Sequence, residues 1–208
     1  MTTRTPMRRA TLIAVTAAAA LVLSACGDDR AGRDGRTAAH HGASASATGH
    51  NAQDVAFAQG MVPHHRQALE MARLAADRAS SARVRDLATR IEKAQAPEIR
   101  TLTGWLDAWG EQAPEAGMDH SGHAGSAGMT GMTGMMSDGD MAALKKATGE
   151  EFDTAFLSLM TEHHRGAVEM ARTERAKGAY GPAERMADGI VTAQNAEIKE
   201  MNQLLGAR

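Results

Sequence analysis

Adjacent histidines flanked by methionines occur twice in this chain, 99 residues apart. The first copy reads FAQGMVPHHRQALEMAR over residues 57–73, and the second reads FLSLMTEHHRGAVEMAR over residues 156–172. In each copy one methionine stands three residues before the first histidine and another stands seven residues after it. Thioether sulfur and imidazole are ligands that suit soft metal ions. The repeated pattern therefore indicates soft-metal chemistry.

The spacing of the first copy predicts an amphipathic helix. At about 100° per residue, Phe57, Met61, His64, Ala68 and Met71 fall in one stripe. His64 then lies at the centre of the apolar side, and the adjacent histidine lies at its edge. A stripe of Met and Ala at helical spacing is also typical of a buried core. The alternative is therefore that the histidines are core residues satisfied by a carboxylate from another helix.

A longer internal repeat surrounds the histidines. Aligning residues 54–106 on residues 153–205 without a gap gives 19 identities in 53 positions. In the first copy, one helix is expected from Asp54, which would cap it, to about Arg78, and Pro63 should bend this helix. A second helix is expected from about Arg83 to Trp109. Two amphipathic hairpins bury their faces most simply against each other. The sequence thus predicts an all-α fold, a four-helix bundle of two repeated helical hairpins; two separate hairpins that each pair with another chain are the alternative.

Four polar residues interrupt the apolar faces of the second and fourth expected helices. They are two glutamines, each followed three residues later by a glutamate: Gln95, Glu98, Gln194 and Glu197. A buried carboxylate needs a partner, and the facing histidine, His64 or His163, is the expected one. These groups would fix the imidazole tautomer from outside the metal site, or act as ligands themselves. Glu70 and Glu169 are expected to be solvated.

A stretch rich in Gly, Met and His separates the two hairpins. Residues 111–140 lack Val, Ile, Leu, Phe, Tyr and Trp, so we expect a flexible loop that adds nothing to the core. Exposed methionine is oxidisable, but its sulfur is a good Cu(I) ligand. The candidate ligands here are Met118, His120, His123, Met129, Met132, Met135 and Met136. A drifted low-complexity repeat or a sacrificial oxidant sink would explain the same composition.

The N-terminus predicts export and a lipid anchor. Arginines precede an apolar run over residues 1–25, which ends in Leu23-Ser24-Ala25 before Cys26. This resembles a bacterial lipoprotein signal, in which the cysteine is lipidated and holds the mature protein on the membrane. Residues 26–53 lack large apolar side chains, so we expect them to form a disordered tether. The bundle domain is expected to begin at residue 54. The histidines in the tether are taken as incidental, with weak metal capture as the alternative.

Charge and composition limit the other function classes. Without residues 1–25 the chain has 20 basic and 25 acidic residues, so it lacks the basic face that nucleic-acid binding requires. The single cysteine rules out an intramolecular disulfide. No nucleophile with an adjacent base, phosphate-binding loop or Cys/His zinc spacing is present. The sequence gives no sign of an enzyme.

The paired motif M-x-x-H-H-x-x-A-x-x-M-A, with A-Q-x-x-E-I downstream, resembles domain-of-unknown-function family 305 over residues 54–205. This is a ferritin-like four-helix family with CopM-type periplasmic copper-binding members. The resemblance implies copper binding and copper tolerance through Met and His ligands. It assigns the ligand role to Met61, His64, His65, Met71, Met160, His163, His164 and Met170.

Three functions follow as hypotheses. The first is an extracytoplasmic, lipid-anchored protein that sequesters or chaperones copper, with Cu(I) favoured over Cu(II), and that hands it to an accepting protein. The second is a ferritin-like di-metal oxidase, which the missing Glu-x-x-His signature disfavours. The third is a structural helical lipoprotein without metal, which explains the bundle but not the Met-rich loop.

Overall fold

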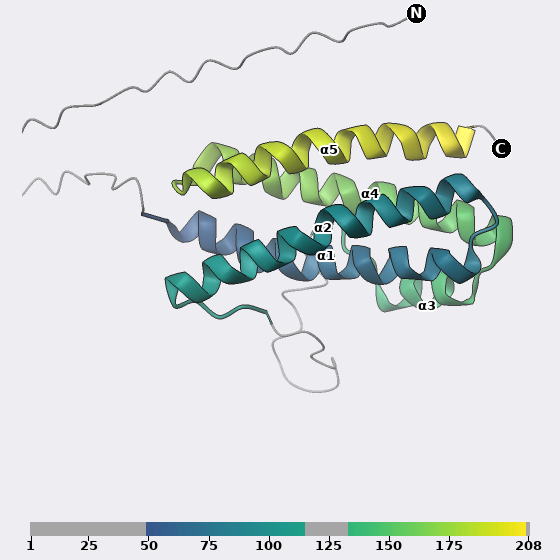
Figure 1. Ribbon diagram of the computed structural model, residues 1–208, viewed down its shortest axis with the longest axis horizontal. Helices are drawn as coiled ribbons and strands as arrows, with labels where there is room; N and C mark the ends of the chain where they lie inside the picture. The colour runs from purple at the N-terminus through teal and green to yellow at the C-terminus, as the bar shows by residue number, and fades with distance from the viewer. Residues whose placement is uncertain (1–48, 115–132, 207–208) are drawn as a thin grey trace, which may run out of the picture. The chain divides into compact units, whose positions relative to one another are not determined.

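The computed structural model describes residues 49–114 and 133–206, and this part of the chain is helical with no strand (Figure 1). The signal segment, Cys26, most of the expected tether and residues 115–132 lie outside the described residues. The helices are α1 (Ala52–Arg78), α2 (Ala82–Trp109), α3 (Asp138–Lys146), α4 (Gly149–Lys177) and α5 (Gly181–Gly206). The all-α prediction is confirmed, with one short helix more than the four expected. None of the described helices combines the length and apolar composition needed to cross a bilayer.

The ends of the helices follow from local side-chain chemistry. Asn51 caps α1: its side-chain oxygen accepts from the main-chain N–H groups of Gln53 and Asp54, and Asp54 accepts from the N–H of Asn51 in return. The prediction of Asp54 as the cap was therefore wrong by three residues, and the helix starts inside the expected tether. α1 runs on through Pro63. α2 ends at Trp109 and is capped by Gly110, whose φ of 74° suits a residue without a Cβ.

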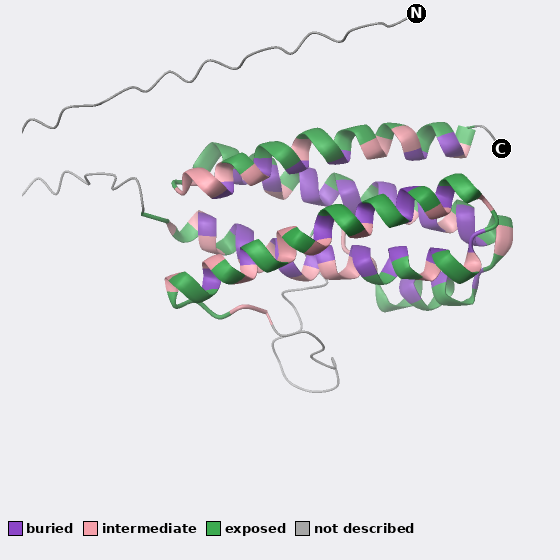
Figure 2. Ribbon diagram, in the orientation of Figure 1, coloured by how far each residue is buried: buried purple, intermediate pink, exposed green. Residues whose placement is uncertain are grey.

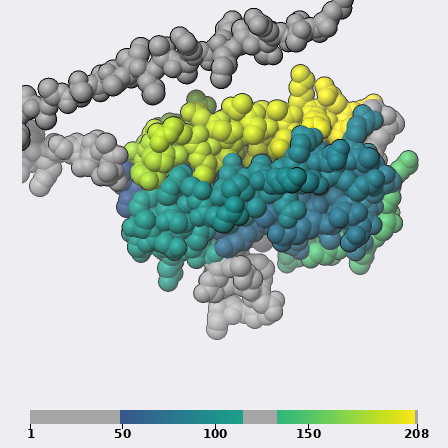
Figure 3. Space-filling view, in the orientation of Figure 1, coloured from purple at the N-terminus to yellow at the C-terminus, as the bar shows by residue number. Residues whose placement is uncertain are grey.

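The two hairpins pack through their first helices. α1 packs on α2 and α4 packs on α5, while α1 and α4 join the two hairpins; α2 and α5 are not among the closely packed pairs. α1 and α4 run antiparallel, since Asn51 at the start of α1 donates to the carbonyl of Lys177 at the end of α4, at 2.9 Å. The buried positions of α1 and α4 consequently form the middle of the bundle (Figure 2). In the space-filling view α2 and α5 cover much of the face turned to the viewer (Figure 3).

Two apolar clusters make up the core. One, the α3 cluster, surrounds Phe152 and Phe156 and includes Met71 and Met160. The other, the tryptophan cluster, surrounds Phe57, Leu102 and Leu106, includes Met61, and is flanked by Trp105 and Trp109. Between the two clusters lies a layer of buried histidines and glutamines. The core is therefore divided by polar residues contributed by both hairpins.

Two equivalent aspartates hold the hairpins together. Asp54 accepts from the N–H groups of Ala179 and Tyr180, in the turn between α4 and α5. Asp153, 99 residues later, accepts from the hydroxyl of Ser80 at 2.6 Å and the N–H of Ser81 at 3.0 Å, in the turn between α1 and α2. Each hairpin thus binds the turn of the other at the same repeat position. The internal repeat is a pseudo-twofold relation in space as well as in sequence.

The end of the Met-rich stretch departs from the loop prediction. Asp138–Lys146 is α3, capped by Ser137 and buried through Met141 and Leu144. Glu70 is exposed, as expected, and forms a surface ion pair with Lys145 of α3 at 2.6 Å. Met136 packs against the α3 cluster. The expected loop boundary at residue 140 was therefore too late, because a short amphipathic helix with a single buried turn leaves little periodicity to detect.

Candidate metal site

His64 on α1 and His163 on α4 meet at the centre of the bundle. Their ring centroids are 3.7 Å apart and the ring planes are tilted by 39°. Both side chains are buried, with 0% and 1% of each residue exposed. Because these residues occupy equivalent repeat positions, their contact lies on the pseudo-twofold axis. The two hairpins thus bring one histidine each to a shared central position.

The ring nitrogens of these two histidines make no hydrogen bond of normal length and angle. Main-chain groups of Thr133 and His64 lie near His64 and His163 respectively. Burial lowers the pKa of His64 to about 3, and repulsion from the charged forms of His65 and His164 adds to the shift; the main chain of Thr133 opposes it only in part. Burial also holds the pKa of His163 well below its usual value, with His64 as the next cause. Both imidazoles are therefore neutral at physiological pH. A neutral imidazole without a partner keeps a lone pair available to a metal ion.

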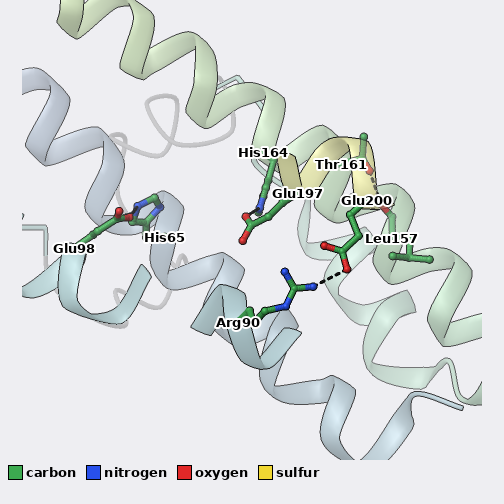
Figure 4. A network of polar contacts seen from close by, with 8 residues as sticks. All are labelled: His65, Arg90, Glu98, Leu157, Thr161, His164, Glu197 and Glu200. Carbon is green, nitrogen blue, oxygen red and sulfur yellow. Dashed lines mark hydrogen bonds and ion pairs between the residues drawn. The ribbon is translucent and has the colours of Figure 1, made fainter. Parts of the chain in front are cut away.

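The neighbouring histidines are held by glutamates. Nε2 of His65 lies 2.8 Å from Oε2 of Glu98, and Nε2 of His164 lies 2.7 Å from Oε2 of Glu197 (Figure 4). Both histidines are fully buried, whereas the two glutamate side chains are 27% and 15% exposed. The expectation that the glutamates would satisfy His64 or His163 was wrong by one residue. The edge histidine faces the second helix of its own hairpin, while the central histidine faces the other hairpin.

Gln95 and Gln194 complete the polar layer. Both are 3% exposed, and neither side-chain oxygen has a hydrogen-bond partner. Within residues 49–114 and 133–206, no three His, Cys, Asp or Glu side chains are arranged to hold a metal ion. A metal site on these helices would consequently need methionine sulfur as well, or residues from the remainder of the chain.

The structure separates the four helical methionines into two pairs. Met61 and Met160 are buried and precede the central histidines by three residues, about 4.5 Å along each helix axis. Met71 is buried and Met170 partly buried, but both follow the histidines by seven residues, about 10 Å along the axis. Met170 lines a hollow of about 240 Å³ with Phe57 and Thr133. The repeated motif is therefore not one compact ligand set, and only its first methionines lie one turn from the histidine pair.

The candidate ligands between the hairpins are only partly described. Met135 and Met136 are half-buried at the C-terminal side of that stretch. The other five, Met118, His120, His123, Met129 and Met132, lie outside the described residues. His50, which the sequence suggested was incidental, is exposed and stacks on Trp109 with ring centroids 4.4 Å apart.

Sequence reasoning missed the residues that dock the end of this stretch onto the site. The Gln67 side chain forms two hydrogen bonds with the main chain of Met136, and Gly166 gives room to Thr133. Gln67 and Gly166 occupy equivalent positions in two otherwise similar copies. That difference between the copies was the available signal.

The Domain of unknown function (DUF305) family model matches residues 54–205. This chain belongs to that family. A DUF305 structure from Streptomyces coelicolor has 35% sequence identity and a TM-score of 0.65, covering 74% of this chain and 93% of that chain. A DUF305 fragment from Deinococcus radiodurans has 33% identity and a TM-score of 0.65, with 76% and 98% covered. No match is found among curated proteins.

Solved structures of the protein CopM are also similar to this chain. CopM in the Cu(II)-bound form has 31% identity and a TM-score of 0.62, and CopM in the Cu(I)-bound form has 28% identity and a TM-score of 0.59. Each covers 74% of this chain and 96% of the CopM chain. Silver-bound forms of CopM match as well. The resemblance stated from the sequence is confirmed, including its CopM-type members.

Proposed function

We propose that this DUF305 protein is an extracytoplasmic, lipid-anchored copper-binding protein that sequesters or carries copper through Met and His ligands. The observation that carries the proposal is the buried His64/His163 pair, whose ring nitrogens make no hydrogen bond of normal length and angle. Burying an imidazole without a partner costs free energy. A bound metal ion would accept those lone pairs and offset that cost.

The chemistry of the pair fits Cu(I) better than a hard cation. Both imidazoles are neutral, so a metal ion does not have to displace a proton. Met61 and Met160 lie one turn away and offer thioether sulfur, which selects Cu(I). The edge histidines have carboxylate partners that fix the orientation of their rings. We therefore assign His64 and His163, with Met61 and Met160, as the central ligands.

The similarity to CopM supports copper as the ion. CopM is solved with Cu(I), Cu(II) and silver bound, and Cu(I) and silver are both soft monovalent ions. The signal segment and Cys26 support an address outside the cytoplasm with a lipid anchor. A role in copper tolerance follows if the protein holds copper outside the cytoplasm until a partner protein accepts it. A ferritin-like di-metal oxidase remains the alternative.

The first prediction tests whether the central histidines are ligands or core residues. In His64→Leu/His163→Leu the side-chain volume is nearly kept and the unpartnered nitrogens are removed. We expect the metal-free domain, residues 27–208, to become more stable by about 1–3 kcal/mol, because buried polar groups without partners are costly. We expect Cu(I) bound in anaerobic chelator competition to fall. Chemical unfolding followed by circular dichroism measures the stability.

A matched pair of methionine variants serves as the control. Met61→Leu/Met160→Leu should weaken Cu(I) binding, whereas Met71→Leu/Met170→Leu, the same change two turns away, should leave the central site unchanged. The proposal fails if the histidine variant binds copper as tightly as the wild type. Loss of stability in that variant without metal would favour a structural role for the pair. Oxygen consumption on loading with Fe(II) would favour the oxidase.

A further inference from the structure

A short segment crosses the bundle directly beside the central histidines. Residues 133–136 run in a non-helical conformation from Thr133 to Met136, just before the cap of α3. The main chain of Thr133 lies against His64 and the segment contacts α4 at Gly166. Gly166 is three residues after His163, so it lies on the same side of α4. We call residues 133–136 the strap.

Two residues at equivalent repeat positions attach the strap, one to each hairpin. On α1, Nε2 of Gln67 donates to the carbonyl of Met136 at 2.9 Å, and Oε1 of Gln67 accepts from the N–H of Met136 at 2.8 Å. On α4, a Cβ at Gly166 would stand 2.0 Å from the carbonyl oxygen of Thr133. In one copy of the repeat this position thus carries a side chain that binds the strap. The other copy lacks the side chain that would exclude it.

A second glycine makes the contact with α4 still closer. Gly134 has a φ of 85°, and a Cβ there would stand 2.8 Å from the Cα of Gly166 and 2.9 Å from the carbonyl oxygen of Glu162. The strap and α4 therefore meet backbone to backbone on both sides of His163 along the helix. A segment this close excludes water and ions from the surface it covers.

The chain before the undescribed residues is attached to the same helix. Nη1 of Arg66 donates to the carbonyl of Pro114 at 2.5 Å, and Nε2 of Gln59 donates to the carbonyl of Gln112 at 3.1 Å. Both ends of the Met-rich stretch are thus fixed to α1 within a few turns of His64. Of the two attachments, only the strap lies against the histidine pair.

We propose that the strap controls metal access to the His64/His163 pair, with Gln67 and Gly166 holding it closed. This inference rests on the proposed function, since it assigns the regulation of that site. Metal enters or leaves when the two Gln67 hydrogen bonds break and the strap lifts from Gly166. Loosening the strap should therefore speed both capture and release, and change the equilibrium affinity much less than either rate.

The test uses one variant that removes an attachment of the strap and one that introduces a clash with it. Both should loosen the strap. Gln67→Ala removes both hydrogen bonds to Met136, and Gly166→Ala places a methyl group against Thr133. The controls are Gln203→Ala, at an exposed position of α5, and Gly189→Ala, a helical glycine with open space around it. In the metal-free protein, residue-resolved mass spectrometry follows diethyl pyrocarbonate labelling of His64 and His163, with exposed His50 as the internal reference. Stopped-flow mixing with Ag⁺ follows binding and release.

Both strap variants should raise the labelling of His64 and His163 by roughly tenfold, and should raise the rates of Ag⁺ binding and release by the same factor. A tenfold change corresponds to about 1.4 kcal/mol, which is the size of effect expected from losing one or two hydrogen bonds. Both controls should behave as the wild type. Unchanged labelling in folded Gln67→Ala would overturn the proposal, as would increased labelling with unchanged Ag⁺ rates. If the wild type binds no Ag⁺, the proposed function fails and the rate inference with it. The labelling result still decides whether the strap shields the pair.

Discussion

At the scale of single residues, two adjacent histidines in each copy have different environments. His64 and His163 face each other without hydrogen-bond partners, whereas His65 and His164 are each paired with a glutamate. Consecutive positions on a helix are separated by about 100°, so neighbours cannot face the same element. The doubled histidine is thus explained by two different contacts. The first histidine of each pair contacts the other hairpin, and the second binds a glutamate of its own hairpin. Replacing one member therefore does not report on the other.

Asp54 and Glu174 form a buried pair of carboxyl groups near the tryptophan cluster, and their pKa values shift in opposite directions. Glu174 is fully buried beside Asp54, and burial raises the pKa of Glu174 to about 8, with the hydrogen bond and charge of Asp54 as further causes. Burial alone would raise the pKa of Asp54. The neighbouring Glu174 carboxyl and the hydrogen bonds from the N–H groups of Asn51, Tyr180 and Ala179 outweigh burial and lower that pKa. At neutral pH Glu174 is therefore mostly protonated and Asp54 is ionised.

Glu174 should make stability depend on pH. Its pKa in the folded state, about 8, is above the ordinary 4.5, so its contribution is complete below about pH 4.5 and is lost as the pH rises through 8. We expect the free energy of unfolding of the wild type to fall by an amount on the order of 1–3 kcal/mol between pH 5 and 9. In Glu174→Gln this fall should be absent, because glutamine cannot ionise. Denaturant unfolding across that range measures it. Glu169→Gln, which changes an exposed acid on the same helix, is the control. If stability falls with pH as steeply in Glu174→Gln as in the wild type, the prediction is wrong.

At the scale of elements, the hairpins are held by a polar contact at each end as well as by the core. The pseudo-twofold relation places Asp54 and Asp153 at opposite ends of the α1 and α4 pair, each bound to the turn of the other hairpin. These contacts fix the register of α1 against α4. They also fix which residues meet at the centre, because a shift by one turn would separate His64 from His163.

We expect Asp153→Ala to destabilise the protein by about 1–3 kcal/mol, because it leaves the Ser81 N–H without its acceptor in a half-buried turn. Chemical unfolding measures the loss. Asp77→Ala, at an exposed position of α1, should change stability by less than about 0.5 kcal/mol. A cost for Asp153→Ala no larger than that of this control would show that apolar packing alone sets the register.

Much of the element scale could be predicted from the sequence. The 3.6-residue pattern in Phe57, Met61, His64 and their equivalents gave the long helices, and the repeat gave the pairing of hairpins. The choice of Glu98 for His65 could not be predicted, because it depends on the rotation of α1 against α2. The strap was hidden for a different reason. The strap contributes only main-chain atoms to its contacts with Gln67 and Gly166, so the one trace in side-chain types is the difference between these two residues.

At the scale of the whole molecule, the divided core connects the site to the fold. The α3 cluster and the tryptophan cluster each bury one of the central methionines, and the histidine layer lies between them. The helices thus supply a rigid frame in which the layer is positioned by apolar packing on both sides. The described end of the Met-rich stretch is the strap, which lies against this frame.

The last prediction separates the ligands of that stretch from its structural end. Replacing Met118, His120, His123, Met129 and Met132 by serine keeps the length of the chain and removes soft ligands only. We expect the copper stoichiometry to fall while the free energy of unfolding changes by less than about 0.5 kcal/mol. Copper titration and chemical unfolding followed by circular dichroism measure the two quantities.

Deleting residues 118–136 should behave differently, because it also removes the strap and Met136. The loss leaves Gln67 without its two main-chain partners and takes an apolar side chain from the edge of the α3 cluster. We expect that deletion to lower stability by about 1–3 kcal/mol beyond the serine variant. Equal stability in the two variants would show that the strap adds nothing to the fold. A serine variant with the wild-type copper stoichiometry would show that these five residues are not copper ligands, and would leave Met135, Met136 and the helical histidines and methionines as the candidates.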